Sequence, residues 1–174
     1  CLVSANGAVC ADVEAWAMSQ GIEARRLAVS HAYHSELIAD AVQPYREALA
    51  KVEFRAPSVP VASTITGAEL TRFDLERLPD LLAEQLVRPV RLADAVRATA
   101  LRGASLFVEC GPKRALSTFV DAILDAKPVL AVPTLHPKVG EMEQFMRAWS
   151  ALWVRDRAAL PAAQQTPEAV VSPQ

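Results

Sequence analysis

The sequence has neither an excess of basic residues nor a long apolar run, and each absence excludes a class of partner. Its 18 lysines and arginines face 20 aspartates and glutamates, for a formal net charge of -2, and the two signs are interspersed. No basic stripe is therefore present to displace counterions from a nucleic acid. The apolar stretches, such as residues 128–133, are far shorter than the roughly 20 residues that cross a bilayer, and no signal segment opens the chain. We expect a cytoplasmic protein without nucleic acid or membrane partners.

Cysteine and histidine are scarce, with three residues of each type. The number of cysteines is odd, and no two of them form a Cys-x-x-Cys pair; they are Cys1, Cys10 and Cys110. The sequence therefore predicts no redox or zinc site. His31 and His34 lie close together in the sequence, but the third histidine is about 100 residues away and no carboxylate stands at ligand spacing beside the pair. We therefore expect no metal.

A nucleophile on a tight strand-to-helix turn, commonly Gly-x-Ser-x-Gly, is also absent, although a self-contained hydrolase would need one. The nearest approach is Gly103-Ala-Ser105-Leu-Phe107, which lacks the second glycine and runs into a predicted strand. An alternative is that Cys110 is a thiol nucleophile with His34 as its base, but no Asn or Asp that would orient the histidine is identifiable. The sequence alone supplies no complete catalytic set.

Apolar periodicity predicts alternating strands and helices. With 52% hydrophobic residues, the chain can fill one compact domain or a large piece of one. Pro44 interrupts a helical pattern, so we expect a kink or a restart within residues 40–44. Strands that alternate with longer helices predict an α/β architecture with a mostly parallel sheet. The expected strands are 1–5, 22–29, 61–64, 105–110 and 129–132. The expected helices lie between Gly7 and Gly21 and at 35–49, 75–86, 91–102, 115–123 and 141–155. Thr66-Gly67 marks a turn, and the chain beyond Ala158 is predicted to be a linker.

The densest chemical signal is segment 29–35, Val-Ser-His-Ala-Tyr-His-Ser, between a predicted strand and the start of a predicted helix. Its two histidines and its tyrosine are suited to supply a base, a metal ligand or a stacking surface. The alternative is that one histidine caps the helix and the other is solvated. Because imidazole titrates near neutrality, proton transfer is the role that would make this segment catalytic.

Several segments resemble, in order and spacing, the second half of the acyltransferase domains of polyketide synthases, the malonyl-CoA:acyl carrier protein type. The resemblance covers about residues 1–155. It is carried by Leu2-Val-Ser4, by 21–35, by Phe54-Arg-Ala-Pro57 with 59–67, by Leu86-Val-Arg-Pro-Val-Arg91, by Phe107-Val-Glu-Cys-Gly-Pro112 and by Leu152-Trp-Val154.

This resemblance implies a fold and a domain division. Residues 1–29 would be the last strand, helix and strand of a ferredoxin-like small subdomain, and residues 30–155 the C-terminal part of a large subdomain similar to the α/β hydrolases. Residues 156–174 would be the linker or tail that follows. The family's Gly-His-Ser-x-Gly nucleophile and the arginine that holds the malonyl carboxylate would lie upstream, outside this sequence.

The resemblance also implies a reaction, in which a serine takes malonyl from coenzyme A and passes it to the phosphopantetheine thiol of an acyl carrier protein. His34 would be the general base, steadied by the backbone carbonyl of Gln85. No permanent cofactor is implied; malonyl-CoA is a substrate. The implied partners are the N-terminal half of the domain, the acyl carrier protein and the ketosynthase domain of the same synthase. The alternative is a non-catalytic docking or scaffold fragment derived from such a domain.

The tetrad His31-Ala-Tyr-His34 implies which acyl group is used. In this family His-Ala-Phe-His generally accompanies malonyl, and Tyr-Ala-Ser-His accompanies methylmalonyl. Tyr33 keeps the bulky ring of the malonyl class, so His31 and Tyr33 are expected to line the substrate pocket.

Overall fold

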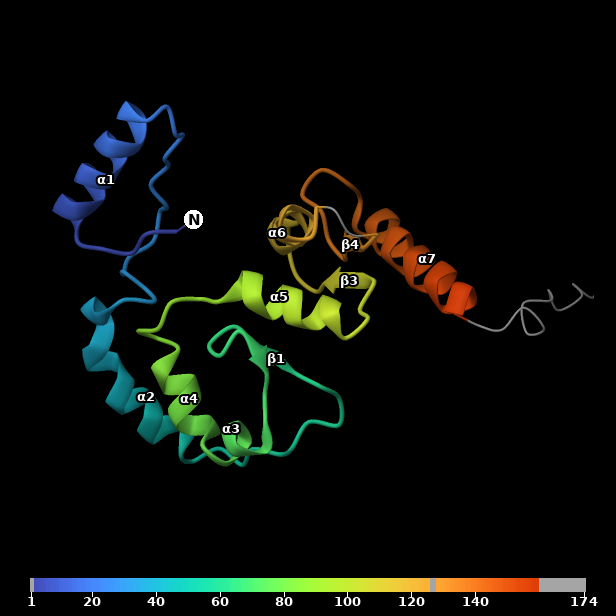
Figure 1. The fold of residues 1–174 in the computed structure, drawn as a ribbon, viewed down its shortest axis with the longest axis horizontal. Coiled ribbons are helices and arrows are strands. Elements are labelled where there is room, and N and C mark those ends of the chain that lie inside the picture. Colours follow the sequence, from blue (N-terminus) through green and yellow to red (C-terminus); the bar gives the residue numbers. More distant parts are fainter. Residues whose placement is uncertain (1, 126–127, 160–174) are drawn as a thin grey trace, which may run out of the picture. The chain divides into compact units, whose positions relative to one another are not determined.

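The computed structural model describes residues 2–125 and 128–159, and the chain divides into two compact units, Cys1–Ala98 and Thr99–Gln174 (Figure 1). We refer to them as the N-terminal and C-terminal units. Among the described residues, no helix is long and apolar enough to cross a membrane.

The N-terminal unit contains mainly short helices. The first, α1, is capped by Asn6, whose side chain accepts a 3.0 Å hydrogen bond from the N–H of Val9, and it is followed by Gly21 at a φ of 67°. This is the local chemistry expected at the two ends of a helix. The elements are α1 (Gly7–Ser19), the 3-10 helix η1 (Glu36–Ala41), α2 (Val42–Leu49), β1 (Ala62–Ser63), β2 (Ala68–Glu69), α3 (Arg72–Glu76), α4 (Leu78–Glu84) and α5 (Leu92–Leu101), whose last residues belong to the other unit.

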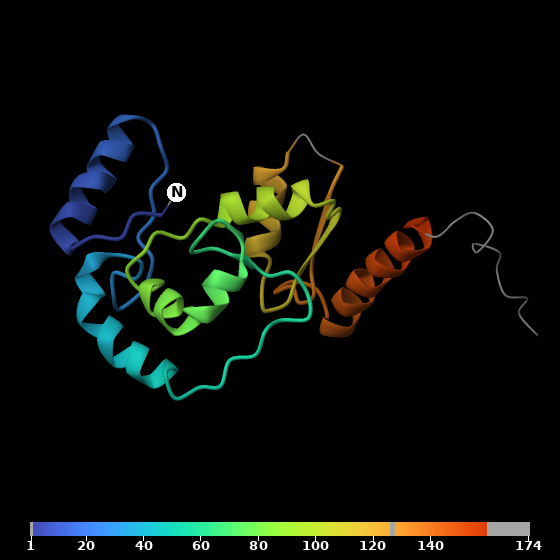
Figure 2. The ribbon, with the colours of Figure 1, turned by 60° about the horizontal axis from the view of Figure 1, so that its bottom comes forward.

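Helices α2 and α4 lie side by side, as both ribbon views show (Figure 1 and Figure 2). Leu49 of α2 and Leu81 and Ala83 of α4 are buried. Arg46 and Asp80 add an ion pair between the two helices, with Nε and Oδ1 2.8 Å apart. These contacts stabilise α2 and α4, two short helices that would be marginal alone. They also fix the end of α4, which Gln85 follows.

The C-terminal unit is built on one strand–helix–strand crossover. Strand β3 (Leu106–Glu109) pairs in parallel with β4 (Leu130–Pro133), with Leu106 opposite Leu130, and α6 (Ala115–Ile123) connects them. Helix α7 (Glu141–Ala159) packs against β4 and β3. The buried side chain of Gln144 donates a 2.7 Å hydrogen bond to the carbonyl of Pro133, which ties α7 to the end of β4.

Several predicted elements are confirmed. Strands β3 and β4 lie where apolar runs predicted them, and α1, α5, α6 and α7 match the helical periodicity. The predicted interruption at Pro44 is also present, because η1 ends at Ala41 and α2 restarts at Val42 with Pro44 in its first turn. Proline is tolerated there, since the first-turn N–H groups have no partner within the helix.

Other predicted elements are wrong. Residues 2–5 and 22–29 form no strand, because neither segment belongs to one of the two sheets of the described residues, and a strand needs a sheet partner for its ladder of hydrogen bonds. The described strands form one antiparallel and one parallel two-stranded sheet, so the sheet is not mostly parallel. The predicted helix 75–86 is two helices, since Pro79 lies in the first turn of α4.

The predicted domain boundaries at 29/30 and 155/156 stay predictions. Most of the predicted linker lies outside the described residues, while residues 156–159 belong to α7.

The carboxylate of Glu109, the last residue of β3, caps the N-terminus of α6. This carboxylate accepts hydrogen bonds from the N–H of Leu116 (3.1 Å) and from the N–H (2.8 Å) and hydroxyl (2.7 Å) of Ser117. Burial alone would raise the pKa of Glu109, but these hydrogen bonds outweigh it and hold the pKa below its ordinary value. A lowered pKa in the folded state stabilises the fold above the ordinary carboxyl pKa, and that stabilisation is lost as pH falls through the folded value.

We therefore expect Glu109→Gln to lower the free energy of unfolding by about 1–3 kcal/mol at pH 7, with a smaller loss in acid. Urea unfolding of the domain at several pH values measures this. Glu143→Gln, which removes the carboxylate from an exposed pair with Arg147, is the matched control and should cost less than about 0.5 kcal/mol. Equal losses for both variants at every pH would contradict the capping role.

Candidate active site

The segment with the two histidines forms a tight turn between residues 22–29 and η1. His34 has a φ of 62°, in the left-handed region that histidine enters more readily than most residues. Ser35 caps η1: its hydroxyl donates to the carbonyl of Ala32 (2.6 Å) and accepts from the N–H of Leu37 (3.3 Å). The backbone is therefore held on both sides of His34.

His34 is bound twice to the chain that follows α4. Its backbone N–H donates to the carbonyl of Leu86 at 2.8 Å, and its Nδ1 lies 2.9 Å from the carbonyl oxygen of Gln85. A carbonyl only accepts, so Nδ1 carries the hydrogen of this bond. In the neutral ring Nε2 then holds the free lone pair, and the half-buried His34 presents a proton acceptor at Nε2.

The end of α4 explains why this carbonyl is available. Gln85 is the C-cap residue of α4, where the last carbonyls have no partner within the helix. The N–H of Gln85 still donates to the carbonyl of Leu81 at 3.2 Å, which keeps the residue in line with the helix. The group that holds His34 is thus the main chain of residue 85, and its side chain takes no part in the bond.

His31 and Tyr33 lie in the same turn and contact each other. Their ring centroids are 5.9 Å apart at a tilt of 55°, and Ser30 Oγ lies 2.8 Å from His31 Nδ1. Both rings are exposed, Tyr33 by 48%. The structure therefore forms two separate pairs from the predicted residues, His34 with Gln85 and His31 with Tyr33.

The remaining candidates lie in the C-terminal unit. Cys110 is exposed at the end of β3, and Ser105 immediately precedes that strand instead of a helix. His136 accepts a 3.1 Å hydrogen bond from the N–H of Lys138 through its Nδ1. Within residues 2–125 and 128–159, no group of three or more His, Cys, Asp or Glu side chains is placed to hold a metal ion.

Two features were missed by sequence reasoning. One is a polar pocket of about 270 Å³ beside α4, in which Glu84 pairs with both Arg77 (2.9 Å) and Arg88 (3.5 Å). The other is a cluster around Arg91, described below, at the end of the segment that begins with Gln85. The sequence marks residues 86–91 of that segment as a motif but gives no sign of what Arg91 contacts.

Comparison with known proteins gives consistent relatives. No family model matches the chain. The chain is 36% identical over 141 residues to polyketide synthase GfsB of Streptomyces halstedii, covering 78% of this chain and 2% of that protein. It is 35% identical over 160 residues to the spectinabilin polyketide synthase system protein NorA' of Streptomyces orinoci, covering 90% and 4%. The chain thus spans a small part of these relatives.

Solved structures show the same relationship. The acyltransferase domain from the second module of the salinomycin polyketide synthase superposes with a TM-score of 0.75 at 33% identity, over 85% of this chain and 34% of that one. The malonyl-CoA:acyl carrier protein transacylase of Xanthomonas oryzae gives 0.71 at 28% identity, over 84% and 44%. These neighbours confirm the predicted α/β class, and the chain spans less than half of each of them, which is consistent with the predicted partial domain.

Proposed function

Since the chain belongs to the acyltransferase domains of polyketide synthases, we propose that it supplies the general base of a malonyl transfer centre. The observation that carries the proposal is the hydrogen bond from His34 Nδ1 to the carbonyl of Gln85. It leaves Nε2 free to accept a proton, which is what a general base must do.

The proposed reaction has two steps, each of which uses His34 as base and then as acid. A serine outside this chain gives its hydroxyl proton to Nε2 of His34 and attacks the thioester carbonyl of malonyl-CoA. The carbon–sulfur bond then breaks, and the departing coenzyme A thiolate takes that proton from Nε2. The phosphopantetheine thiol of an acyl carrier protein then gives its proton to Nε2 and attacks the acyl-serine, and the serine leaves with that proton. This is nucleophilic catalysis of the kind in which a neighbouring base activates the nucleophile.

The proposal includes dependence on the part of the domain that carries the serine. Two observations support it. The chain covers 34% and 44% of the two solved chains described above. Large apolar side chains are also exposed along α7, including Phe145, Trp149 and Trp153. Exposed apolar surface of this kind marks an interface that another segment covers.

Reconstitution tests this proposal. The chain is produced alone, and also together with an upstream acyltransferase segment that carries Gly-His-Ser-x-Gly, and each sample is given radiolabelled malonyl-CoA and an acyl carrier protein. We expect labelled carrier protein only with both pieces, and aggregation of the chain produced alone. A stable complex that transfers no label would instead favour the docking or scaffold alternative. A soluble, cooperatively unfolding monomer of the chain alone would contradict the dependence.

A further inference from the structure

The carbonyl that holds His34 begins a short irregular segment, residues 85–91, between α4 and α5. The N–H groups of Val87 and Arg88 donate to the carbonyl of Glu84 at 3.1 and 3.0 Å, which completes the last turn. Pro89 follows and has no N–H to donate. The position of the segment therefore depends on how its two ends are anchored.

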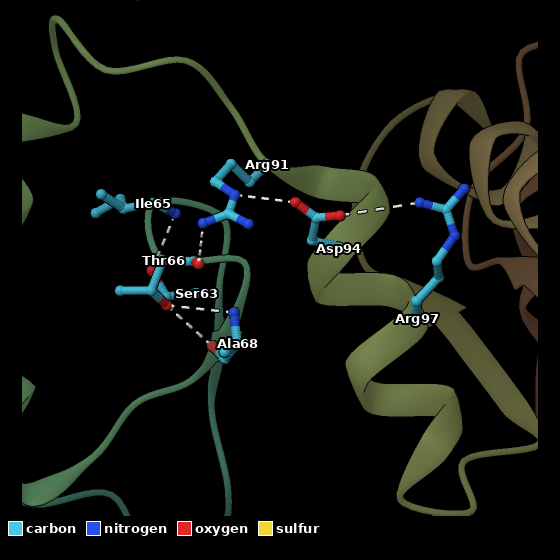
Figure 3. Close-up of polar contacts among 7 residues, drawn as sticks. All are labelled: Ser63, Ile65, Thr66, Ala68, Arg91, Asp94 and Arg97. Atoms are coloured by element: carbon cyan, nitrogen blue, oxygen red, sulfur yellow. Dashed lines mark hydrogen bonds and ion pairs between the residues drawn. The ribbon is translucent and has the colours of Figure 1, made fainter.

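Arg91 anchors the far end in three directions. Its backbone N–H donates to the carbonyl of Thr64 at 2.7 Å. Its Nη1 donates to the carbonyl of Thr66 at 2.8 Å, and its Nε lies 2.9 Å from Oδ2 of Asp94 (Figure 3). Thr64 and Thr66 belong to the turn between β1 and β2, and Asp94 lies in the first turn of α5. One residue thus joins the hairpin, the segment and the helix.

The hairpin turn packs closely against this anchor at Gly67. Gly67 has a φ of 73°, and a Cβ at this position would lie 2.8 Å from Cβ of Asp94 and 3.0 Å from Nε of Arg91. Only glycine satisfies both the conformation and the space. The contact between turn and anchor is therefore a specific packed arrangement.

We propose that Arg91 is a positioning residue for His34, acting through segment 85–91, with Asp94 and Gly67 holding its guanidinium in place. The inference rests on the proposed function, because the placement of Gln85 matters for rate only if His34 is the base. Lysine would not replace Arg91 fully, since the planar guanidinium donates to Thr66 and Asp94 at once, whereas an ammonium on a flexible stem does not hold that geometry.

The test compares Arg91→Ala, Arg91→Lys and Gly67→Ala in the domain that contains this chain. For Arg91→Ala we expect kcat for malonyl transfer to fall about 10- to 100-fold, the scale of a small misplacement of a reacting group, with KM for malonyl-CoA nearly unchanged. The kcat of Arg91→Lys should lie between that of the parent protein and that of Arg91→Ala. Gly67→Ala disturbs the same contact without removing the arginine and should lower kcat in the same direction. Arg97→Ala is the matched control, because Arg97 reaches Asp94 only at 3.9 Å.

A second measurement separates positioning from general destabilisation. Spectra of ¹⁵N-labelled histidine report which ring nitrogen of His34 carries hydrogen: Nδ1 in the parent protein, and a mixture of both tautomers in folded Arg91→Ala. The positioning role is wrong if Arg91→Ala and Gly67→Ala are folded, keep the tautomer of the parent protein, and have the same kcat as the control variant Arg97→Ala. If His34→Asn itself retains full transfer, the proposed function fails instead, so the two failures are distinguishable.

Discussion

Replacing His34 by asparagine is expected to lower the rate of malonyl transfer by about 100- to 10,000-fold, the usual contribution of a general base. Asparagine is the suitable replacement because it also tolerates the left-handed backbone that His34 adopts, with a φ of 62°. Its side-chain N–H can still donate a hydrogen bond, but it offers no basic nitrogen. Transfer of radiolabelled malonyl to the carrier protein measures the loss, and thermal unfolding checks that the fold is kept.

Two variants serve as controls for this result. His31→Ala should cost less, because His31 pairs with Ser30 and Tyr33 and not with the end of α4. Gln85→Ala should transfer at nearly the parent rate, since the bond from His34 goes to the main-chain oxygen. A greater loss for His31→Ala than for His34→Asn would place the base three residues earlier in the sequence.

In competition between the two coenzyme A thioesters, malonyl is expected to be loaded about 10- to 200-fold faster than methylmalonyl, the range that one methyl group in a pocket supplies. The expectation rests on the resemblance of the tetrad His31-Ala-Tyr-His34 to that of the malonyl class, in which Tyr33 keeps the bulky ring; this ring lies 5.9 Å from that of His31. A ring beside the α-carbon of the acyl group would collide with a methyl branch. Tyr33→Ser combined with His31→Tyr should narrow the preference.

Mass spectrometry of the loaded carrier protein measures the ratio of the two products. Tyr33→Phe is the matched control, because it keeps the ring and removes only the hydroxyl; it should keep the malonyl preference. A methylmalonyl majority with the parent protein would overturn the assignment. A large change in Tyr33→Phe would show instead that the hydroxyl selects the acyl group.

The elements that could be predicted from sequence are those with a local cause. Strands β3 and β4 are short apolar runs between turn residues, and the restart at Val42 follows from Pro44. Residues 22–29, which we predicted as a strand although they include Glu23, Arg25 and Arg26, form none, because a strand depends on a distant partner that no local pattern reveals.

The candidate site shows the same division. Segment 29–35 stands out in the sequence because two histidines and a tyrosine fall together. The contact between His34 and Gln85 joins residues 51 positions apart, and no spacing rule predicts it; only the resemblance to a known family implied it. The contacts of Arg91 with Thr66 and Asp94 were not anticipated at all, since a motif identifies residues without saying what they touch.

The bond from His34 to residue 85 has a consequence for how this site varies in evolution. A codon change alters a side chain, but the carbonyl oxygen at position 85 is present whichever amino acid is encoded. Selection on this contact therefore acts on the backbone path, through residues that shape the end of α4, and not on the identity of residue 85. A mutational scan would rank position 85 as tolerant. Replacement of the peptide bond between Gln85 and Leu86 by an ester weakens the carbonyl of residue 85 as an acceptor. This change would reveal that transfer depends on the carbonyl, which the scan cannot show.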